Sequence, residues 1–155
     1  DNFDKESSHV FAAFIKRFVE AKRNGLNKVT CWGTGSPYRE FLHVDDLANA
    51  CVFALEKWDL NAKNAPKDKE ESPLPFLNVG TGSDISIRDL ANLIADLMNY
   101  DGKILWDSTK PDGTPKKQLD VSRINTLGWY SKISLDVGIS ETIKLYKESK
   151  INILN

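Results

Sequence analysis

Hydrophobic residues recur along this chain at two spacings, one typical of helices and one typical of strands. Segments with helical spacing begin near a capping residue or end at a glycine. The predicted helices cover residues 8–24, 45–57, 86–97, 122–127 and 135–146. Strand-like runs are shorter and lie between the helices. The predicted strands cover residues 29–32, 38–44, 76–79 and 103–106.

The first predicted helix has a clear start and stop, because Ser7 or Ser8 can cap it and Gly25 can end it. The next two strands flank a Gly-Thr-Gly-Ser-Pro turn, which predicts a hairpin. Asp45 or Asp46 is then expected to cap the following helix. The apolar positions of that helix are Leu47, Ala50, Cys51, Ala54 and Leu55.

Residues 59–75 carry many charges and three prolines but almost nothing apolar, which predicts a solvated, mobile loop. Elsewhere short strands and helices alternate, with no internal repeat. This alternation predicts a mixed α/β fold. The length of 155 residues corresponds to about one domain with a real core.

Composition removes several classes of function. Lys and Arg total 21 against 22 Asp and Glu, so the net charge of -1 gives no field that would attract nucleic acid or an anionic membrane. No apolar run approaches the roughly 20 residues that cross a bilayer. The first residues do not resemble a signal peptide, and the first of them is not a methionine. We therefore expect a soluble, cytoplasmic chain cut from something longer.

Two cysteines are too few and too far from other ligand types to suggest a zinc site or a disulfide framework. Cys31 and Cys51 are interpreted as small core residues, and no metal is expected. His43 lies among apolar residues and fits a structural histidine.

Four positions carry candidate chemistry. His9 lies at the start of a helix, whose positive end helps an imidazolium release its proton, although it can equally bond nearby backbone. Arg17, two turns later, and Arg39, after the glycine turn, can grip a diphosphate bidentately. A solvated helix face is an equal interpretation for Arg17. Asp112 can accept bonds from sugar or base donors, or can simply belong to a Pro-Asp-Gly turn.

Two motifs are interpreted as structural. Gly80-Thr81-Gly82 suggests a phosphate cradle, but it lacks the third glycine of a dinucleotide fingerprint and the ending of a P-loop. Tyr146 and Lys150 have the Tyr-x-x-x-Lys spacing of short-chain dehydrogenases. Tyr146, however, is predicted to lie on a terminal helix and to face the core of the domain.

An ordered set of motifs runs along nearly the whole chain. The set consists of Ser-His-Val at 8–10, Trp-Gly-Thr-Gly-Ser-Pro-Tyr-Arg-Glu-Phe-Leu-His-Val-Asp-Asp at 32–46, Asn-Val-Gly-Thr-Gly at 78–82, Lys-Pro-Asp-Gly-Thr-Pro at 110–115 and Leu-Gly-Trp-Tyr at 127–130. In this order the motifs resemble the C-terminal half of the GDP-L-fucose synthases, which are extended short-chain dehydrogenase/reductases of the NAD-dependent epimerase/dehydratase family.

The resemblance implies an NADP-dependent enzyme that epimerises GDP-4-keto-6-deoxy-D-mannose at carbons 3 and 5, then reduces the 4-keto group to give GDP-L-fucose. It implies that His9 is the acid in epimerisation and lies next to the cofactor. It also implies that Arg17, Trp32, Arg39 and Asp112 bind the nucleotide sugar, with Trp32 as an aromatic wall. In the full-length parent it implies a homodimer.

The resemblance also implies that essential parts lie upstream of Asp1. These are the glycine-rich NADP-binding Rossmann half, the Ser-Tyr-Lys catalytic set and the epimerising cysteine. Residues 1–155 are therefore expected to form one substrate-binding portion that completes the Rossmann sheet of the absent half, and to be inactive alone. Two alternatives stay open: another nucleotide-sugar epimerase or reductase, and a free-standing nucleotide-sugar-binding module without catalysis.

Overall fold

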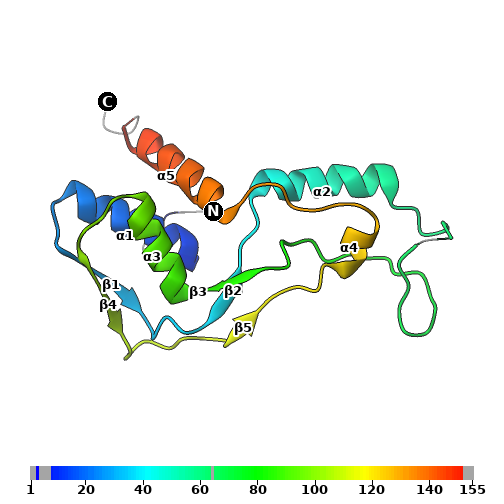
Figure 1. Cartoon of the computed structure of the whole chain (residues 1–155), viewed down its shortest axis with the longest axis horizontal. Coiled ribbons are helices and arrows are strands. Elements are labelled where there is room, and N and C mark those ends of the chain that lie inside the picture. The colour runs from blue at the N-terminus through cyan, green and yellow to red at the C-terminus, as the bar shows by residue number, and fades with distance from the viewer. Residues whose placement is uncertain (1–2, 4–7, 64, 152–155) are drawn as a thin grey trace. The chain divides into compact units, whose positions relative to one another are not determined.

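The computed structural model describes residues 3, 8–63 and 65–151, so Ser7, one of two expected helix caps, lies outside the described residues. Helices and short strands alternate along the chain (Figure 1). The elements are α1 (Val10–Arg23), β1 (Lys28–Trp32), β2 (Tyr38–Glu40), α2 (Val44–Lys57), β3 (Asp84–Ser86), α3 (Ile87–Leu97), β4 (Lys103–Asp107), β5 (Lys116–Lys117), α4 (Ser122–Thr126) and α5 (Leu135–Ile151). The predicted mixed α/β fold is confirmed.

The chain divides into two compact units, each built from separate stretches of sequence. The first unit contains Asp1–Tyr38, Ile85–Lys116 and Asp136–Asn155. The second contains Arg39–Asp84 and Lys117–Leu135. The single substrate-binding portion expected over residues 1–155 stays a prediction, and each unit is described by itself below.

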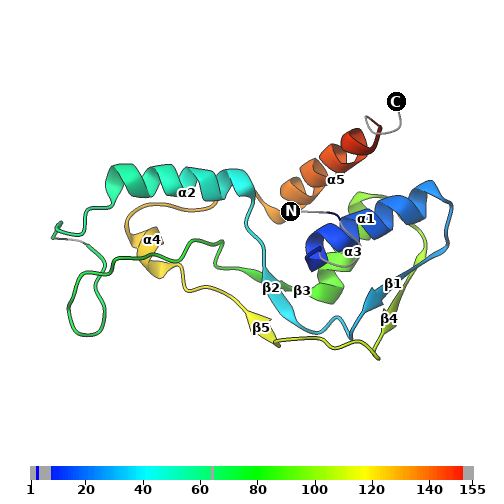
Figure 2. The same cartoon turned by 180° about the vertical axis from the view of Figure 1, so that it is seen from behind.

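A parallel pair of strands forms the sheet of the first unit. β1 pairs with β4 from Lys28 opposite Lys103 to Trp32 opposite Asp107. α1 packs against both β1 and α3, and these elements lie side by side from the front and from behind (Figure 1, Figure 2). Parallel strands need a long connection, so this pairing joins segments about half the chain apart.

The hairpin predicted across the glycine turn is wrong. β2 belongs to a different sheet of three strands, in the order β3-β2-β5. Backbone bonds explain the difference, because Gly33 N donates to the carbonyl of Asp107 at 2.9 Å and Tyr38 N donates to that of Pro115 at 2.8 Å. The two ends of the turn are thus bonded to the segment 107–115 and not to each other. β2 is also shorter than the predicted strand 38–44.

The helices of the first unit bury apolar residues at helical spacing, but the prediction that Leu97 of α3 faces inward is wrong, because this residue is exposed. Phe14, Ile15 and Phe18 of α1 are buried, although the N-cap is His9 and not a serine. Ser86 caps α3, since its hydroxyl accepts a hydrogen bond from Asp89 N at 3.0 Å. Ile139, Ile143 and Tyr146 of α5 are buried, which confirms that Tyr146 faces the core.

The core of the second unit forms around Trp129, whose indole nitrogen donates to Asn49 Oδ1 at 2.9 Å. Its buried members are Ala50, Val121, Ile124 and Trp129. The segment 76–79 contributes half-buried Leu77 and Val79 to this core without forming the predicted strand. The apolar residues at 76–79 therefore belong to an irregular segment that packs against the core, and the predicted strand is wrong.

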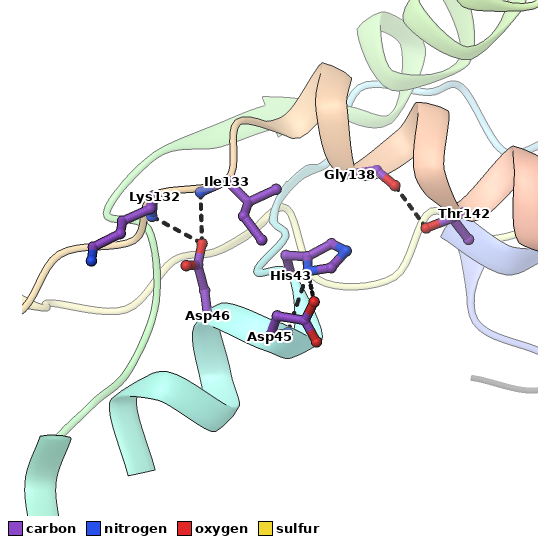
Figure 3. A network of polar contacts seen from close by, with 7 residues as sticks. All are labelled: His43, Asp45, Asp46, Lys132, Ile133, Gly138 and Thr142. Atoms are coloured by element: carbon purple, nitrogen blue, oxygen red, sulfur yellow. Dashed lines mark hydrogen bonds and ion pairs between the residues drawn. The ribbon is translucent and has the colours of Figure 1, made fainter. Parts of the chain in front are cut away.

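The start of α2 differs from the prediction, as Figure 3 shows. His43 is the N-cap, because its Nδ1 accepts from Asp45 N at 3.2 Å, which confirms a structural histidine. Asp46 is buried and accepts from the backbone nitrogens of Lys132 at 3.0 Å and Ile133 at 2.9 Å. Neither aspartate is the cap. Asp46 instead ties α2 to the segment before α5.

The predicted apolar face of α2 is wrong in part, since only Ala50 among its five positions is buried. Leu47 and Leu55 are exposed, and so is Cys51. Ala50 belongs to the core around Trp129 and half-buried Phe53 packs against that core, whereas Leu47 and Leu55 stay exposed.

The segment 59–75 contains more order than its composition suggests. Asp68 Oδ1 accepts from the backbone nitrogens of Glu70 and Ser72, both at 2.9 Å, and Ala65 and Leu74 are buried. The mobility of this loop stays a prediction. No helix in the described part of the chain is long and apolar enough to cross a membrane.

Candidate functional site

An exposed aromatic ring with two cations beside it marks the end of β1. Trp32 is 56% exposed, which is unusual for the largest apolar side chain. The guanidinium carbon of Arg17 lies 5.1 Å from the ring centroid, and Lys110 Nζ lies 5.5 Å from it. Both distances are within the range of cation–π attraction. An aromatic wall flanked by positive charge suits a nucleotide, which combines a flat base with a diphosphate.

Arg17 is oriented by the strand beneath it. Its Nη1 donates to the carbonyl of Thr30 at 3.1 Å, and α1 packs against β1. Arg17 is half-buried, and its role in substrate binding stays a prediction. A guanidinium carries five N–H groups in a planar fork, so an arginine placed in this way can also donate to an anion.

The glycine turn after Trp32 is tied to the loop that contains Asp112. Asp112 Oδ1 accepts from Thr34 N at 2.6 Å, and Oδ2 accepts from Thr34 Oγ1 at 2.7 Å. These bonds hold the pKa of the Asp112 carboxyl below its usual range. Gly33 has φ 78°, and a Cβ there would overlap the Asp112 carboxylate, so the turn requires glycine. Asp112 thus fixes the shape of the turn.

A second aromatic residue supports the other side of the turn. The ring of Trp106 lies against Gly35: a Cβ added to this glycine would be only 2.7 Å from the nearest ring atom. The guanidinium carbon of Arg88 lies 4.7 Å from the Trp106 centroid, and Arg88 Nη2 donates to the carbonyl of Thr34. Sequence reasoning missed Arg88, because its position in the first turn of α3 shows no link to a turn over 50 residues earlier.

Lys110 is the first residue of the Lys-Pro-Asp-Gly-Thr-Pro motif and follows a bonded turn. Asp107 Oδ1 accepts from Thr109 N at 3.1 Å and from Thr109 Oγ1 at 2.5 Å, and Lys110 N donates to the carbonyl of Asp107 at 3.1 Å. The bonds from Thr109 lower the pKa of Asp107. The turn after β4 is therefore built to place Lys110, and the pairing of β4 with β1 brings it to Trp32.

His9 is exposed at the N-cap of α1, where its carbonyl accepts from Ala13 N at 2.9 Å. Its imidazole makes no capping hydrogen bond. The alternative interpretation of His9 was a side chain that bonds the backbone of the first turn. The structure shows no such capping bond from the imidazole. Exposure of the ring fits a group that must reach a ligand.

Arg39 lies on β2 in the second unit and is half-buried. Its place in one site with Arg17 and Trp32 stays a prediction. Its neighbour Glu40 accepts hydrogen bonds from the Gly80–Gly82 turn at Thr81 N and Gly82 N, at 2.6 and 2.7 Å. The amides of that turn therefore bind an internal carboxylate, in agreement with the structural interpretation of the motif.

The cysteines take no part in this arrangement. Cys31 is fully buried on β1, and burial raises the pKa of its thiol to about 11, although Arg17 acts in the opposite direction. It is a core residue, as predicted, but Cys51 is exposed, so that prediction is wrong. Among the residues that the structure describes, no group of three or more His, Cys, Asp or Glu residues can hold a metal ion.

The chain resembles known proteins over nearly its whole length. Residues 1–66 match the model of the NAD dependent epimerase/dehydratase family. GDP-L-fucose synthase 1 of Arabidopsis thaliana is 47% identical over 152 residues, which cover 98% of this chain and 43% of that protein. GDP-L-fucose synthase of Escherichia coli (strain K12) is 43% identical over 150 residues, or 97% of this chain and 46% of that protein.

A solved structure gives the same result. The crystal structure of a GDP-L-fucose synthetase from Naegleria fowleri bound to NADP superposes with a TM-score of 0.77 at 26% identity, over 97% of this chain and 43% of that one. The predicted resemblance and fold class are confirmed: the chain is similar to proteins of the NAD-dependent epimerase/dehydratase family. Within that class it is similar, over nearly its whole length, to GDP-L-fucose synthases, and it spans less than half of their length.

Proposed function

We propose that this chain forms the GDP-sugar-binding part of a GDP-L-fucose synthase. The complete enzyme converts GDP-4-keto-6-deoxy-D-mannose to GDP-L-fucose by epimerisation at carbons 3 and 5 and reduction of the 4-keto group. One observation carries the proposal: the chain is 43–47% identical, over nearly its whole length, to proteins named GDP-L-fucose synthase. The exposed Trp32, with two cations within 5.5 Å of the ring centroid, suits the nucleotide of such a substrate.

Four side chains are proposed to bind the nucleotide sugar. Trp32 supplies an aromatic wall, and Arg17 donates to the diphosphate. Arg39 contributes a second guanidinium to the same ligand. Asp112 accepts from a sugar or base donor with the lone pairs that Thr34 does not use, since a carboxylate offers about four acceptor positions. All four contacts concern substrate binding.

His9 acts as the general acid of the epimerisation. A 4-keto group acidifies the neighbouring C–H bonds, so a base and an acid on opposite faces of the ring invert them. The imidazole is exposed at the N-cap of α1 and makes no capping hydrogen bond, so it can reach a bound substrate. The same imidazole lies next to NADP in the complete enzyme. NADPH, when bound, supplies the hydride for the 4-keto reduction.

Three further properties belong to the complete protein: its location, its oligomeric state and its cofactor. We expect a cytoplasmic homodimer that uses NADP bound mainly by a Rossmann half outside residues 1–155. Light scattering of the complete protein measures the dimer. A monomer at micromolar concentration would contradict that part.

An activity assay tests the proposal. The complete protein that carries this chain is expected to consume NADPH in the presence of GDP-4-keto-6-deoxy-D-mannose and to release GDP-L-fucose, identified by chromatography and mass. Residues 1–155 alone are expected to bind GDP and to show no turnover. A complete protein that binds the keto sugar without consuming NADPH would contradict the proposal.

A further inference from the structure

Glu40, next to Arg39 on β2, is the centre of a hydrogen-bond cluster in the second unit. Its Oε1 accepts from Thr81 N at 2.6 Å, Gly82 N at 2.7 Å and Thr81 Oγ1 at 3.3 Å. Its Oε2 accepts from Leu119 N at 2.8 Å. One carboxylate therefore joins β2 to two segments that lie about 40 and 80 residues further along the chain.

The Gly80–Gly82 turn is shaped around this carboxylate. A Cβ at Gly80 would overlap Glu40 Oε1, so only glycine allows the approach. Gln118 Nε2 donates to the carbonyl of Gly82 at 2.5 Å and holds the turn from the other segment. Successive backbone amides of this kind form a concave anion site, which here contains a side chain of the protein itself.

Several features make this cluster a firm connection. Bonds from N–H groups to a carboxylate are charge-assisted, and three backbone donors converge on Glu40. A glutamine in its place keeps one acceptor oxygen but presents an amide nitrogen, which donates, to the other segment. The substitution therefore leaves one segment attached and releases the other, with almost no change in volume.

Arg39 depends on the same strand. β2 contains only Tyr38, Arg39 and Glu40, and adjacent side chains of a strand point to opposite faces. The backbone that carries Arg39 is thus fixed by the bonds that its neighbour makes. We propose that Glu40 is a positioning residue for Arg39: by binding residues 81–82 and 119, it fixes the backbone of β2, from which the Arg39 side chain extends to bind the substrate diphosphate.

This inference rests on the proposed function, because it requires Arg39 to bind substrate. The experiment is a double-mutant cycle in the complete protein, with KM for the keto sugar and kcat measured from NADPH loss. Glu40→Gln is expected to raise KM about tenfold, with kcat within about twofold of wild type, because a displaced arginine weakens a charge-assisted contact. Glu56→Gln, at an exposed position of α2, is the matched control and should leave both values unchanged.

The cycle distinguishes positioning from general stability. If Glu40 acts through Arg39, then Glu40→Gln adds no further increase in KM to an Arg39→Ala variant. Multiplicative effects of the two substitutions would overturn the inference. If Arg39→Ala alone left KM unchanged, the role of Arg39 in the proposed function would fail instead.

A shorter carboxylate provides the second variant. Glu40→Asp keeps the charge but is too short to reach both attached segments, so it should also raise KM. This variant provides the test if Glu40→Gln does not fold. Its effect should also disappear in the Arg39→Ala background. Wild-type KM in the Glu40→Asp variant would overturn the proposal.

Discussion

The Asp112 carboxylate and Thr34 are joined by two hydrogen bonds, of 2.6 Å from the threonine backbone nitrogen and 2.7 Å from its hydroxyl. This contact connects the loop after β4 to the turn after β1, and thereby places Lys110 and Trp32 on one side of the first unit. A residue expected to bind substrate therefore also shapes the site in which binding takes place.

The first prediction concerns the pH dependence of this contact. Its bonds from Thr34 lower the pKa of Asp112 below the ordinary value of 3.8. A carboxyl with a lowered pKa stabilises the folded form above its ordinary pKa, and this stabilisation is lost as the pH falls through the lowered value. The amide signal of Thr34, followed by NMR on the complete protein, is expected to titrate with a midpoint below 3.8. Thr34→Val removes the hydroxyl donor and should move the midpoint upward, and a midpoint of 3.8 or higher in the wild type would contradict the contact.

The second prediction concerns the glycine turn itself. Gly35 has φ 77°, and a Cβ would lie 2.7 Å from the ring of Trp106, so Gly35→Ala combines backbone strain with overlap. Gly25 has φ 62° with open space around it, so Gly25→Ala costs only the strain, about 1–2 kcal/mol. In urea unfolding, Gly35→Ala should lower the free energy of unfolding by a further amount of about 1–3 kcal/mol. Equal losses for the two variants would show that the turn accommodates a side chain.

The third prediction separates Arg17 from the general charge of α1. Arg17→Ala is expected to weaken GDP binding by roughly 1.5–3 kcal/mol, because it removes a charge-assisted contact to the diphosphate. Arg23→Ala, in the last turn of the same helix, removes the same charge away from Trp32 and should leave GDP binding unchanged. Titration calorimetry on the complete protein measures both. Equal effects would mean that only the net charge matters.

The fourth prediction concerns His9. His9→Asn keeps a hydrogen-bonding side chain but cannot act as a general acid near neutral pH. It should retain GDP binding and lose about 100-fold or more in conversion of the keto sugar, in line with the usual contribution of general acid–base catalysis. Unchanged NADPH consumption would remove His9 from the acid role.

Sequence periodicity predicted the elements whose faces are decided locally. The helices at Phe14 and Phe18 and at Ile139 and Ile143, and the strand that contains Cys31, are where the pattern places them. Strand pairing depends on distant segments, so the apparent hairpin around Gly35 did not indicate that β1 pairs with β4. The prediction that Leu55 is buried was wrong for a related reason. Apolar spacing alone does not show which side of a helix faces a core.

The candidate site was predictable only in its separate parts. Trp32 and Asp112 were named from motifs and Arg17 from its place on the first helix, and the structure brings them into the same unit. The contact of Lys110 with Trp32 and that of Arg88 with Thr34 depend on the parallel register of β1 and β4 and on the position of α3. No local pattern encodes either contact.

Isotope incorporation during turnover tests the central claim most directly. With the complete protein, GDP-4-keto-6-deoxy-D-mannose and NADPH in deuterated water, epimerisation at carbons 3 and 5 exchanges both C–H bonds with solvent, whereas the hydrogen added at carbon 4 comes from NADPH. The account predicts GDP-L-fucose with solvent deuterium at carbons 3 and 5 and none at carbon 4. A reduced product without solvent deuterium at carbons 3 and 5 would identify a simple 4-keto reductase and contradict the account.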